Sequence, residues 1–229
     1  MGLIVHHLQA SQSERITWLC EELGIDYELV KHQRDPFLSP QSIKDLNPIG
    51  QAPVIQDGDV TLPESGAITE YIIHKYGNGK LALDPSDKDY AKYLYWFHFA
   101  NGNLHPQLSR VMVLKHAHVN PEEWHAQRHF NQLTKFLNFM DNHLETNQWL
   151  VGDQFTAADI MNVFPLTTMR TFSGEDISAY PNILAWLKRA TERDGYKKSR
   201  AKGDPELPLM IDGEPPAQFL DKLKAEGKM

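Results

Sequence analysis

One stretch of the chain, residues 47–68, restricts the possible folds more than any other. Within it, Pro53 directly precedes an apolar run that begins at Val54. A proline pushes the preceding residue, here Ala52, out of the helical region, and it cannot itself donate a ladder hydrogen bond. The stretch therefore predicts an exposed backbone edge beside a strand, and such an edge can pair with an extended peptide.

The remainder of the same stretch predicts a hairpin followed by a helix. The turn sequence Gln56-Asp57-Gly58-Asp59 separates two short apolar runs, so residues 54–62 are expected to form a β-hairpin. Ser65 stands where a helix N-cap is expected, ahead of a helical pattern that runs to Tyr76. Because a helix start offers free N–H groups and partial positive charge, the stretch predicts a site for a small acidic peptide.

The flanking segments predict an α/β unit followed by helices. A strand at residues 3–5, a helix from Ser13 to Gly24 and a strand at residues 27–30 together indicate a right-handed βαβ unit. After Gly77-Asn78-Gly79 the strand patterns stop and the periodicity becomes helical. The expected organisation is an α/β domain at residues 1–78, a linker at 79–86 and an all-α domain at 87–229, which ends in a proline-rich tail.

The helical part contains several recognisable helix signals. A long helix is expected over residues 86–116, bent near Pro106. Asn120-Pro121-Glu122-Glu123 is expected to start the next helix, and an N-capping box at Thr156 to Asp159 precedes a third, over residues 160–172. The tail after Gly203 is expected to wrap over a surface or hang free, with a short helix near residues 219–223.

Charge and cysteine content narrow the classes of function. The net charge of −7 argues against a nucleic-acid partner. The single cysteine, Cys20, excludes an internal disulfide and a Cys-x-x-Cys redox site, and its place on an apolar helix stripe indicates core packing. No run approaches membrane-spanning length and the first residues lack a secretory signal pattern, so we expect a cytoplasmic protein without a membrane partner.

The 11 histidines do not form a recognised metal motif. His125 and His129 are four residues apart, as in the zinc-protease motif, but the glutamate of that motif is missing between them. We therefore expect neither a catalytic nor a structural metal.

Two motifs in residues 47–68 resemble the glutathione site of the cytosolic glutathione transferases. Asn-Pro-x-Gly-x-x-Pro-Val at residues 47–54 is followed by Glu-Ser-x-Ala-Ile at residues 64–68. The resemblance implies a thioredoxin-like N-terminal domain and an all-α C-terminal domain, with Pro53 in the cis form. It also implies glutathione-binding roles for six residues: Ala52 and Pro53 at the cysteinyl part, Glu64 and Ser65 at the γ-glutamyl end, and Gln51 and Lys44 at the glycine end.

The same resemblance points to a serine as the group that activates glutathione. The run Ser11-Gln12-Ser13-Glu14-Arg15 is similar to a stretch of the theta-type transferases whose first serine is the activating hydroxyl, which implies that role for Ser11. The residue pattern between Ser11 and Arg15 departs from that stretch, so Ser13 is the second choice. A free thiol is only slightly ionised at neutral pH, and a hydroxyl that donates to the sulfur can lower its pKa by about one to two units. The alternative is that both serines are ordinary cap or turn residues.

A site for the second substrate is expected between the domains. His98, Asn101 and His105 have spacings that place them on one face of an α-helix, where they would line an electrophile pocket. The alternative is that these three side chains are polar contacts in a domain interface.

The motifs together predict a transferase that activates glutathione as its thiolate for conjugation to small electrophiles, as in detoxification. Its pattern is similar to fungal and bacterial members of the family, and the resemblance implies a homodimer. Two alternatives stay open. One is a glutathione-dependent disulfide or peroxide reductase, and the other is a non-catalytic binding or regulatory module on the same fold.

Overall fold

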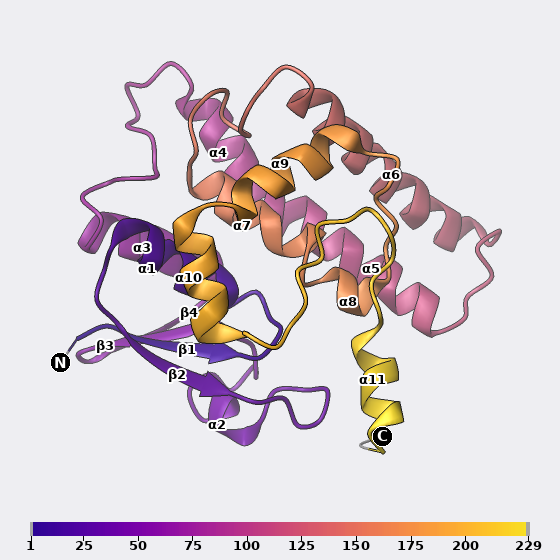
Figure 1. The fold of residues 1–229 in the computed structure, drawn as a ribbon, viewed down its shortest axis with the longest axis horizontal. Helices are drawn as coiled ribbons and strands as arrows, with labels where there is room; N and C mark the ends of the chain where they lie inside the picture. Colours follow the sequence, from indigo (N-terminus) through magenta and orange to yellow (C-terminus); the bar gives the residue numbers. More distant parts are fainter. Residues whose placement is uncertain (1, 228–229) are drawn as a thin grey trace. The chain divides into compact units, whose positions relative to one another are not determined.

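The structure, a computed structural model, describes residues 2–227, which divide into two compact units (Figure 1). Among these residues, the first unit comprises 2–84, 191–209 and 220–227, and the second comprises 85–190 and 210–219. The chain therefore passes from one unit to the other close to the expected linker at 79–86, but two later segments group with the first unit.

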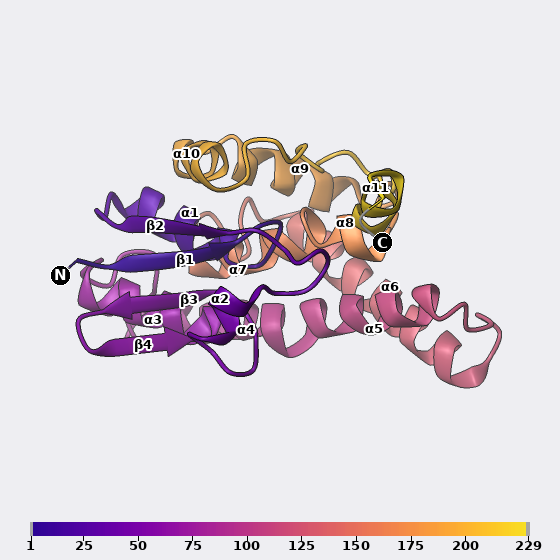
Figure 2. The same ribbon diagram turned by 90° about the horizontal axis from the view of Figure 1, so that it is seen from below.

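The first unit is built on a mixed four-stranded sheet with the strand order β2-β1-β3-β4. β1 pairs with β2 in parallel, while β1 with β3 and β3 with β4 are antiparallel. In Figures 1 and 2, helices α1 and α3 lie on one face of this sheet and α2 lies on the other. The elements are β1 (Ile4–Leu8), α1 (Glu14–Leu23), β2 (Glu28–His32), α2 (Gln41–Lys44), β3 (Val54–Asp57), β4 (Val60–Pro63), α3 (Ser65–Lys75) and α10 (Asp194–Gly203).

Local sequence signals explain most of this unit. The hairpin β3–β4 turns at Gly58, whose φ of 59° is the left-handed conformation that glycine adopts readily. α1 ends at Gly24 in the same conformation, with its N–H bonded to the carbonyls of Cys20 and Glu21. The predicted hairpin and the predicted end of the first helix are both confirmed.

The start of α3 differs from the expectation. Ser65 is the first helical residue, and the N-cap position belongs to Glu64, which makes no side-chain capping bond. The reason is that the Ser65 hydroxyl is used elsewhere, because it accepts a hydrogen bond from the guanidinium of Arg15 at 3.1 Å. The prediction of Ser65 as a conventional N-cap was therefore wrong by one position.

Helix α10 joins the first unit because it packs along α1. Trp18 of α1 and Tyr196 of α10 form an edge-to-face ring pair with centroids 5.0 Å apart. The two backbones also approach closely, since a Cβ added at Gly195 would lie 3.0 Å from the Cα of Glu22. This packing is why residues 191–209 fall with the α/β unit and not with the helical one.

The helices are the regular elements of the second unit among its described residues, apart from isolated β-bridges within residues 149–154. Fully buried side chains from different helices form its core, including Leu104, Met140, Ile160 and Trp186. Its elements are α4 (Tyr90–Phe99), the π-helix η1 (Ala100–Leu104), α5 (His105–His116), α6 (Trp124–Leu144), α7 (Ala157–Leu166), α8 (Arg170–Ser173) and α9 (Pro181–Thr191).

The expected long helix over 86–116 starts later and is interrupted. It begins at Tyr90 and contains a π-helical turn, residues 100–104, directly before α5. Pro106 explains the interruption, because it has no N–H to donate and its ring crowds the preceding turn. A wider turn with i to i+5 bonding accommodates such a defect without ending the helix.

Two other helix boundaries were predicted wrongly. Residues 120–123 form a turn, in which the Glu123 N–H donates to the Asn120 carbonyl at 3.0 Å, so α6 begins only at Trp124. α7 ends at Leu166 instead of reaching residue 172. The Thr167 hydroxyl donates back to the Val163 carbonyl at 2.9 Å, and such back-bonding disturbs a helix.

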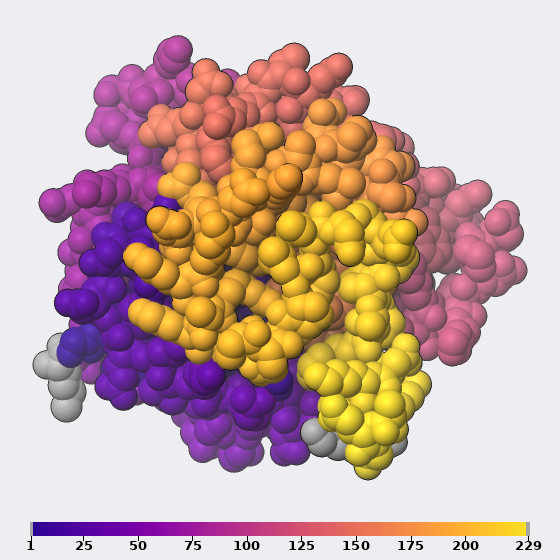
Figure 3. Space-filling view, in the orientation of Figure 1, coloured from indigo at the N-terminus to yellow at the C-terminus, as the bar shows by residue number. Residues whose placement is uncertain are grey.

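The predicted capping box and the predicted short C-terminal helix are confirmed. Thr156 and Asp159 cap α7 reciprocally, and both are fully buried. The chain after Gly203 runs over the molecular surface (Figure 3) and forms α11 (Phe219–Ala225).

Candidate functional site

The sheet register brings the predicted glutathione residues of the first unit to one edge. β3 runs antiparallel to both β1 and β4, so its start lies beside the ends of those two strands. Ser11 follows the end of β1, Ala52 precedes the start of β3, and Glu64 follows the end of β4. Three separate segments of the chain therefore meet at the same end of the sheet.

The peptide bond between Ala52 and Pro53 is cis, as the resemblance implies. The ladder of β3 starts only at Val54, which leaves the Ala52 backbone outside the paired region. Asn47 shapes the preceding turn, since its side-chain amide donates to the Gln51 carbonyl at 2.9 Å. The segment that presents Ala52 is thus held by a buried side chain that sequence reasoning did not single out.

Lys44, the last residue of α2, has its side chain beside the turn that leads to Gln51. A Cβ added at Gly50 would lie 3.4 Å from Cγ of Lys44, so the lysine side chain passes over the glycine that precedes Gln51. Both Lys44 and Gln51 are exposed. Their side chains are therefore accessible to a ligand at this edge.

Glu64 has an unusual backbone, with φ at 75° and ψ at 110°. This conformation costs a residue with a Cβ about 1–3 kcal/mol, and such strain is concentrated at functional sites. The Glu64 side chain is exposed and stands at the amino-terminal end of α3. The next residue, Ser65, is buried with only 2% of its surface exposed.

A buried arginine joins the start of α3 to the loop after β1. Arg15 donates from one guanidinium nitrogen to Ser65 Oγ at 3.1 Å and to Gln12 Oε1 at 2.9 Å. Burial lowers the pKa of Arg15 to about 9, and the charge of Glu14 partly opposes this. Gln12 and Arg15 were not predicted as site residues, although both lie inside the run that resembles the theta-type stretch.

The two candidate serines have different surroundings. Ser13 is fully buried, and its Oγ contacts the backbone of Leu8, accepting from N–H at 3.0 Å and lying 3.2 Å from the carbonyl oxygen. Ser11 retains 6% exposure, and its Oγ accepts a hydrogen bond from the Ser13 N–H at 3.2 Å. The two hydroxyl oxygens are 2.7 Å apart, directly before the start of α1.

The loop between β1 and α1 is anchored from two sides. Arg34 donates to the carbonyls of Gln9 at 2.9 Å and Ala10 at 3.1 Å. On the other side, the Ala10 N–H donates to the carboxylate of Asp204 at 3.2 Å. Burial lowers the pKa of Arg34 to about 10, with the charge of Asp204 opposing the shift. These anchors restrict the position of Ser11.

The three candidates for an electrophile pocket lie in the second unit, and their expected alignment was wrong. The π-helical turn separates His98 from His105, so the α-helical spacing that placed them on one face does not hold. His98 is exposed, whereas Asn101 and His105 are half-buried. His105 packs its ring edge-to-face against Phe164, with centroids 5.2 Å apart. An electrophile-binding role for these residues stays a prediction.

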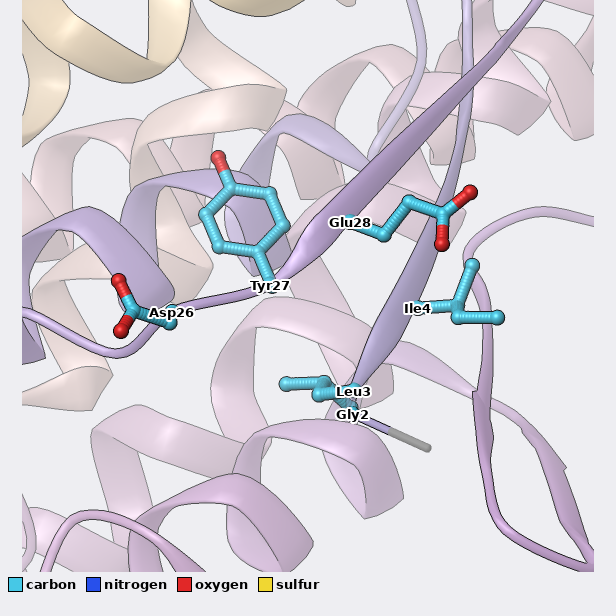
Figure 4. Close-up of a pocket in the computed structure, with 6 residues that line it drawn as sticks. All are labelled: Gly2, Leu3, Ile4, Asp26, Tyr27 and Glu28. Atoms are coloured by element: carbon cyan, nitrogen blue, oxygen red, sulfur yellow. The ribbon is translucent and has the colours of Figure 1, made fainter.

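Other features of the described residues lie away from this site. A cavity of about 410 Å³ is lined by Gly2, Leu3, Ile4, Asp26, Tyr27 and Glu28 (Figure 4). It lies at the start of β1, whereas Ser11 follows the end of that strand. Cys20 is a core residue as predicted, and burial raises its thiol pKa to about 12.

Within residues 2–227 no group of three or more His, Cys, Asp or Glu side chains is placed to hold a metal ion. Over the same residues, every helix is too short or too polar to cross a membrane.

Comparison with known proteins agrees with the class that the fold and the site define. The profile of the glutathione S-transferase N-terminal domain matches residues 5–80, and that of the C-terminal domain matches residues 104–194. Glutathione S-transferase 3 of Schizosaccharomyces pombe is 34% identical over 93% of both chains. Glutathione S-transferase 3 of Zea mays is 31% identical over 82% of this chain and 87% of its own.

A solved structure supports the same assignment. A glutathione S-transferase from Actinobacillus pleuropneumoniae is 30% identical and covers 88% of this chain and 93% of its own, with a TM-score of 0.79. An α/β unit with a cis proline before β3, followed by a helical unit, is the architecture of a glutathione transferase. The chain belongs to the glutathione S-transferase family, and it is a glutathione transferase enzyme.

Proposed function

We propose that this enzyme activates bound glutathione as its thiolate through the hydroxyl of Ser11 and conjugates it to small electrophiles. The observation that carries the proposal is the position of Ser11. Its hydroxyl lies before the start of α1, at the sheet edge that also holds Ala52 and Glu64, and it keeps some exposure to solvent. Ser13 is the poorer candidate because it is fully buried and its Oγ is already surrounded by protein partners.

Each part of glutathione has a chemically suitable partner at this edge. The backbone of Ala52, outside the β3 ladder, would pair with the cysteinyl unit. The γ-glutamyl end would place its ammonium at Glu64 and its carboxylate at the amino terminus of α3, where Ser65 lies. The glycine carboxylate would lie near Lys44 and Gln51.

The energetics favour a hydroxyl donor over the helix terminus alone. A helix amino terminus stabilises an anion by about 0.3–1 kcal/mol, which is less than one pKa unit. A hydrogen bond to a charged acceptor adds about 1.5–3 kcal/mol, or about one to two units. Together they are enough to make the thiolate a major form of bound glutathione at neutral pH.

The test is an ultraviolet difference titration of glutathione bound to the wild type and to Ser11→Ala. We expect the wild-type thiol pKa to lie well below that of free glutathione and the variant to raise it by about one to two units. Ser178→Ala, which changes an exposed serine of the second unit, is the matched control and should leave the value unchanged.

Other results would favour the alternative functions. If glutathione binds but its pKa is unshifted in the wild type and in Ser11→Ala, the chain acts as a binding module. If activity on a glutathione mixed disulfide exceeds activity on an aryl halide, the reductase function is correct instead.

We also propose that the enzyme is a cytoplasmic homodimer that acts in detoxification. Exposed aromatic surface supports an interface on the second unit, where Tyr95 is 49% exposed and Phe139 is 47% exposed, with ring centroids 6.1 Å apart. Light scattering coupled to size exclusion tests the dimer. A mass of one chain, 26.2 kDa, at micromolar concentration would contradict it.

A further inference from the structure

A continuous chain of buried hydrogen bonds runs behind the candidate activating serine. Ser11 Oγ and Ser13 Oγ are 2.7 Å apart, and Ser13 Oγ is 2.9 Å from Nδ1 of His7. On its other side, Nε2 of His7 is 3.0 Å from Oδ2 of Asp204. All four residues belong to the first unit, and none is more than 6% exposed.

We propose that His7, held by Asp204, is a positioning residue that acts through Ser13 to direct the hydroxyl of Ser11 toward the sulfur of glutathione. This inference rests on the proposed function, in which Ser11 donates to the thiolate. His7 and Asp204 do not touch glutathione in this arrangement, and their effect is transmitted by hydrogen-bond direction.

Asp204 sets the direction in which the hydrogen bonds of this chain donate. Burial would raise the pKa of Asp204, but hydrogen bonds from His7 and Ala10 and the charge of Arg200 hold it below its ordinary value. An ionised carboxylate can only accept hydrogen bonds, so the Nε2 atom of His7 carries a proton that it donates to Asp204.

The other nitrogen of His7 decides which way Ser13 points. When Nδ1 also carries a proton, it donates to Ser13 Oγ, and the Ser13 proton must go to Ser11 or to the Leu8 carbonyl. The contact to Ser11 is the shorter of the two, at 2.7 Å against 3.2 Å. Ser11 then accepts from the Ser13 hydroxyl, and its own proton is left to donate outward to the sulfur.

The packing around His7 fits a locked orientation. A Cβ added at Gly203 would lie 3.1 Å from Nε2 and 3.3 Å from Cε1 of His7, so the end of α10 lies directly against the imidazole ring. His7 and Asp204 are 1% and 3% exposed. The ring therefore has little room to rotate, and its two nitrogens keep their separate partners.

The order serine, histidine, aspartate also occurs in hydrolases, but this arrangement does not fit that chemistry. A nucleophilic serine must be reachable by its substrate, whereas Ser13 is fully buried. Ser13 Oγ also lies within hydrogen-bond distance of Leu8, His7 and Ser11, which leaves no place for an acyl group.

The experiment compares the thiol pKa of bound glutathione in the full-length wild type, His7→Leu, His7→Asn, Ser11→Ala and the double variant Ser11→Ala with His7→Leu. Leucine removes the donor, whereas asparagine places an N–H donor near the position of Nδ1. We expect His7→Leu to raise the pKa by about half a unit to one unit and His7→Asn to recover at least half of that shift.

The double variant separates positioning from a general structural effect. If His7 acts through Ser11, His7→Leu does not change the thiol pKa further once Ser11 is alanine, and the dissociation constant of glutathione, measured at a pH below the wild-type thiol pKa, stays within about twofold throughout. An equal shift in both backgrounds, or no shift in His7→Leu alone, would overturn the proposal. If His7→Leu does not fold, Ser13→Ala is carried through the same comparison with the same expectations.

The failure of this inference is distinguishable from failure of the proposed function. If Ser11→Ala raises the thiol pKa and His7→Leu does not, only the positioning role is wrong. If Ser11→Ala itself leaves the pKa unchanged, the proposed activation by Ser11 is wrong, and the positioning role fails with it.

Discussion

Arg170 donates from Nη2 to the carbonyl of Gly213 at 2.9 Å, a contact between residues 43 positions apart in the helical unit. The same guanidinium donates to the carbonyls of Glu175 at 2.9 Å and Asp212 at 2.8 Å and also contacts Glu214. Gly213 passes so close to Ser178 that an added Cβ would lie 2.3 Å from its Cα. The proline-rich tail is thus held to this unit by backbone contacts to one buried arginine.

Replacing Arg170 by methionine should detach this tail. The substitution leaves several buried carbonyl oxygens without a donor, so we expect the free energy of unfolding to fall by about 3 kcal/mol or more. Limited proteolysis should show new cleavage within residues 205–218. Arg128→Met, on the exposed face of α6, is the matched control and should change stability by less than about 0.5 kcal/mol. Unchanged proteolysis of the Arg170 variant would contradict the anchoring role.

Asp57 should make the stability of the enzyme depend on acid pH. Hydrogen bonds from Lys75 at 2.7 Å and Tyr76 at 2.7 Å lower the pKa of Asp57 to about 2, below its ordinary value of 3.8. Because the folded pKa is the lower one, this stabilisation is fully present above pH 4 and is lost as the pH falls through 2.

The corresponding experiment compares chemical unfolding of the wild type and Asp57→Asn at several pH values. The wild type should be the more stable at pH 6, and the difference should shrink steadily from pH 4 to pH 2. A difference that does not depend on pH would mean that the ionisation of Asp57 does not contribute.

Glycine at position 203 should be required for the packing of α10 against β1. In Gly203→Ala the new methyl group would lie 3.1 Å from the His7 ring, closer than carbon contacts normally allow, and we expect a loss of about 1–3 kcal/mol. Gly102→Ala is the control, because a Cβ there meets nothing within 4 Å. Equilibrium unfolding in urea measures both changes, and equal stability of the two variants would rule out the close contact.

Glu64 is expected to lower the stability of the fold and to strengthen the binding of glutathione. Glycine relieves the strain of a φ of 75°, so Glu64→Gly is expected to be at least as stable as the wild type. The loss of a charge-assisted contact should weaken glutathione binding by about tenfold or more. Calorimetric titration with glutathione measures the affinity, with the exposed Glu70→Gln as a charge control on α3. Unchanged affinity in Glu64→Gly would remove Glu64 from the proposed site.

Elements that depend on a few neighbouring residues were predictable from the sequence. The β3–β4 hairpin follows from the turn at Gly58, and the end of α1 follows from Gly24. The capping box of Thr156 and Asp159 also identified the start of α7, because all of its groups lie within one helical turn.

Boundaries that depend on competing contacts were not predictable in the same way. Ser65 is a residue type that often caps helices, but its hydroxyl accepts a hydrogen bond from Arg15. Ser65 is therefore the first residue of α3, one position earlier than the predicted helix start. The sequence indicated a bend near Pro106, yet it could not specify that the chain would relax into a π-helical turn. In both cases the outcome depends on contacts outside the local pattern.

The sequence by itself determined the family, and it predicted the sheet-edge residues around Ala52 and Glu64 and an activating serine in the loop after β1. Only the tertiary structure decided that His7 and Asp204, 197 positions apart, meet behind Ser11. The physical reason is that local sequence patterns depend on interactions within one turn or one strand pair. The contact between His7 and Asp204 forms only because α10 packs along α1 and because Gly203, which has no side chain, allows the end of α10 to approach the imidazole ring.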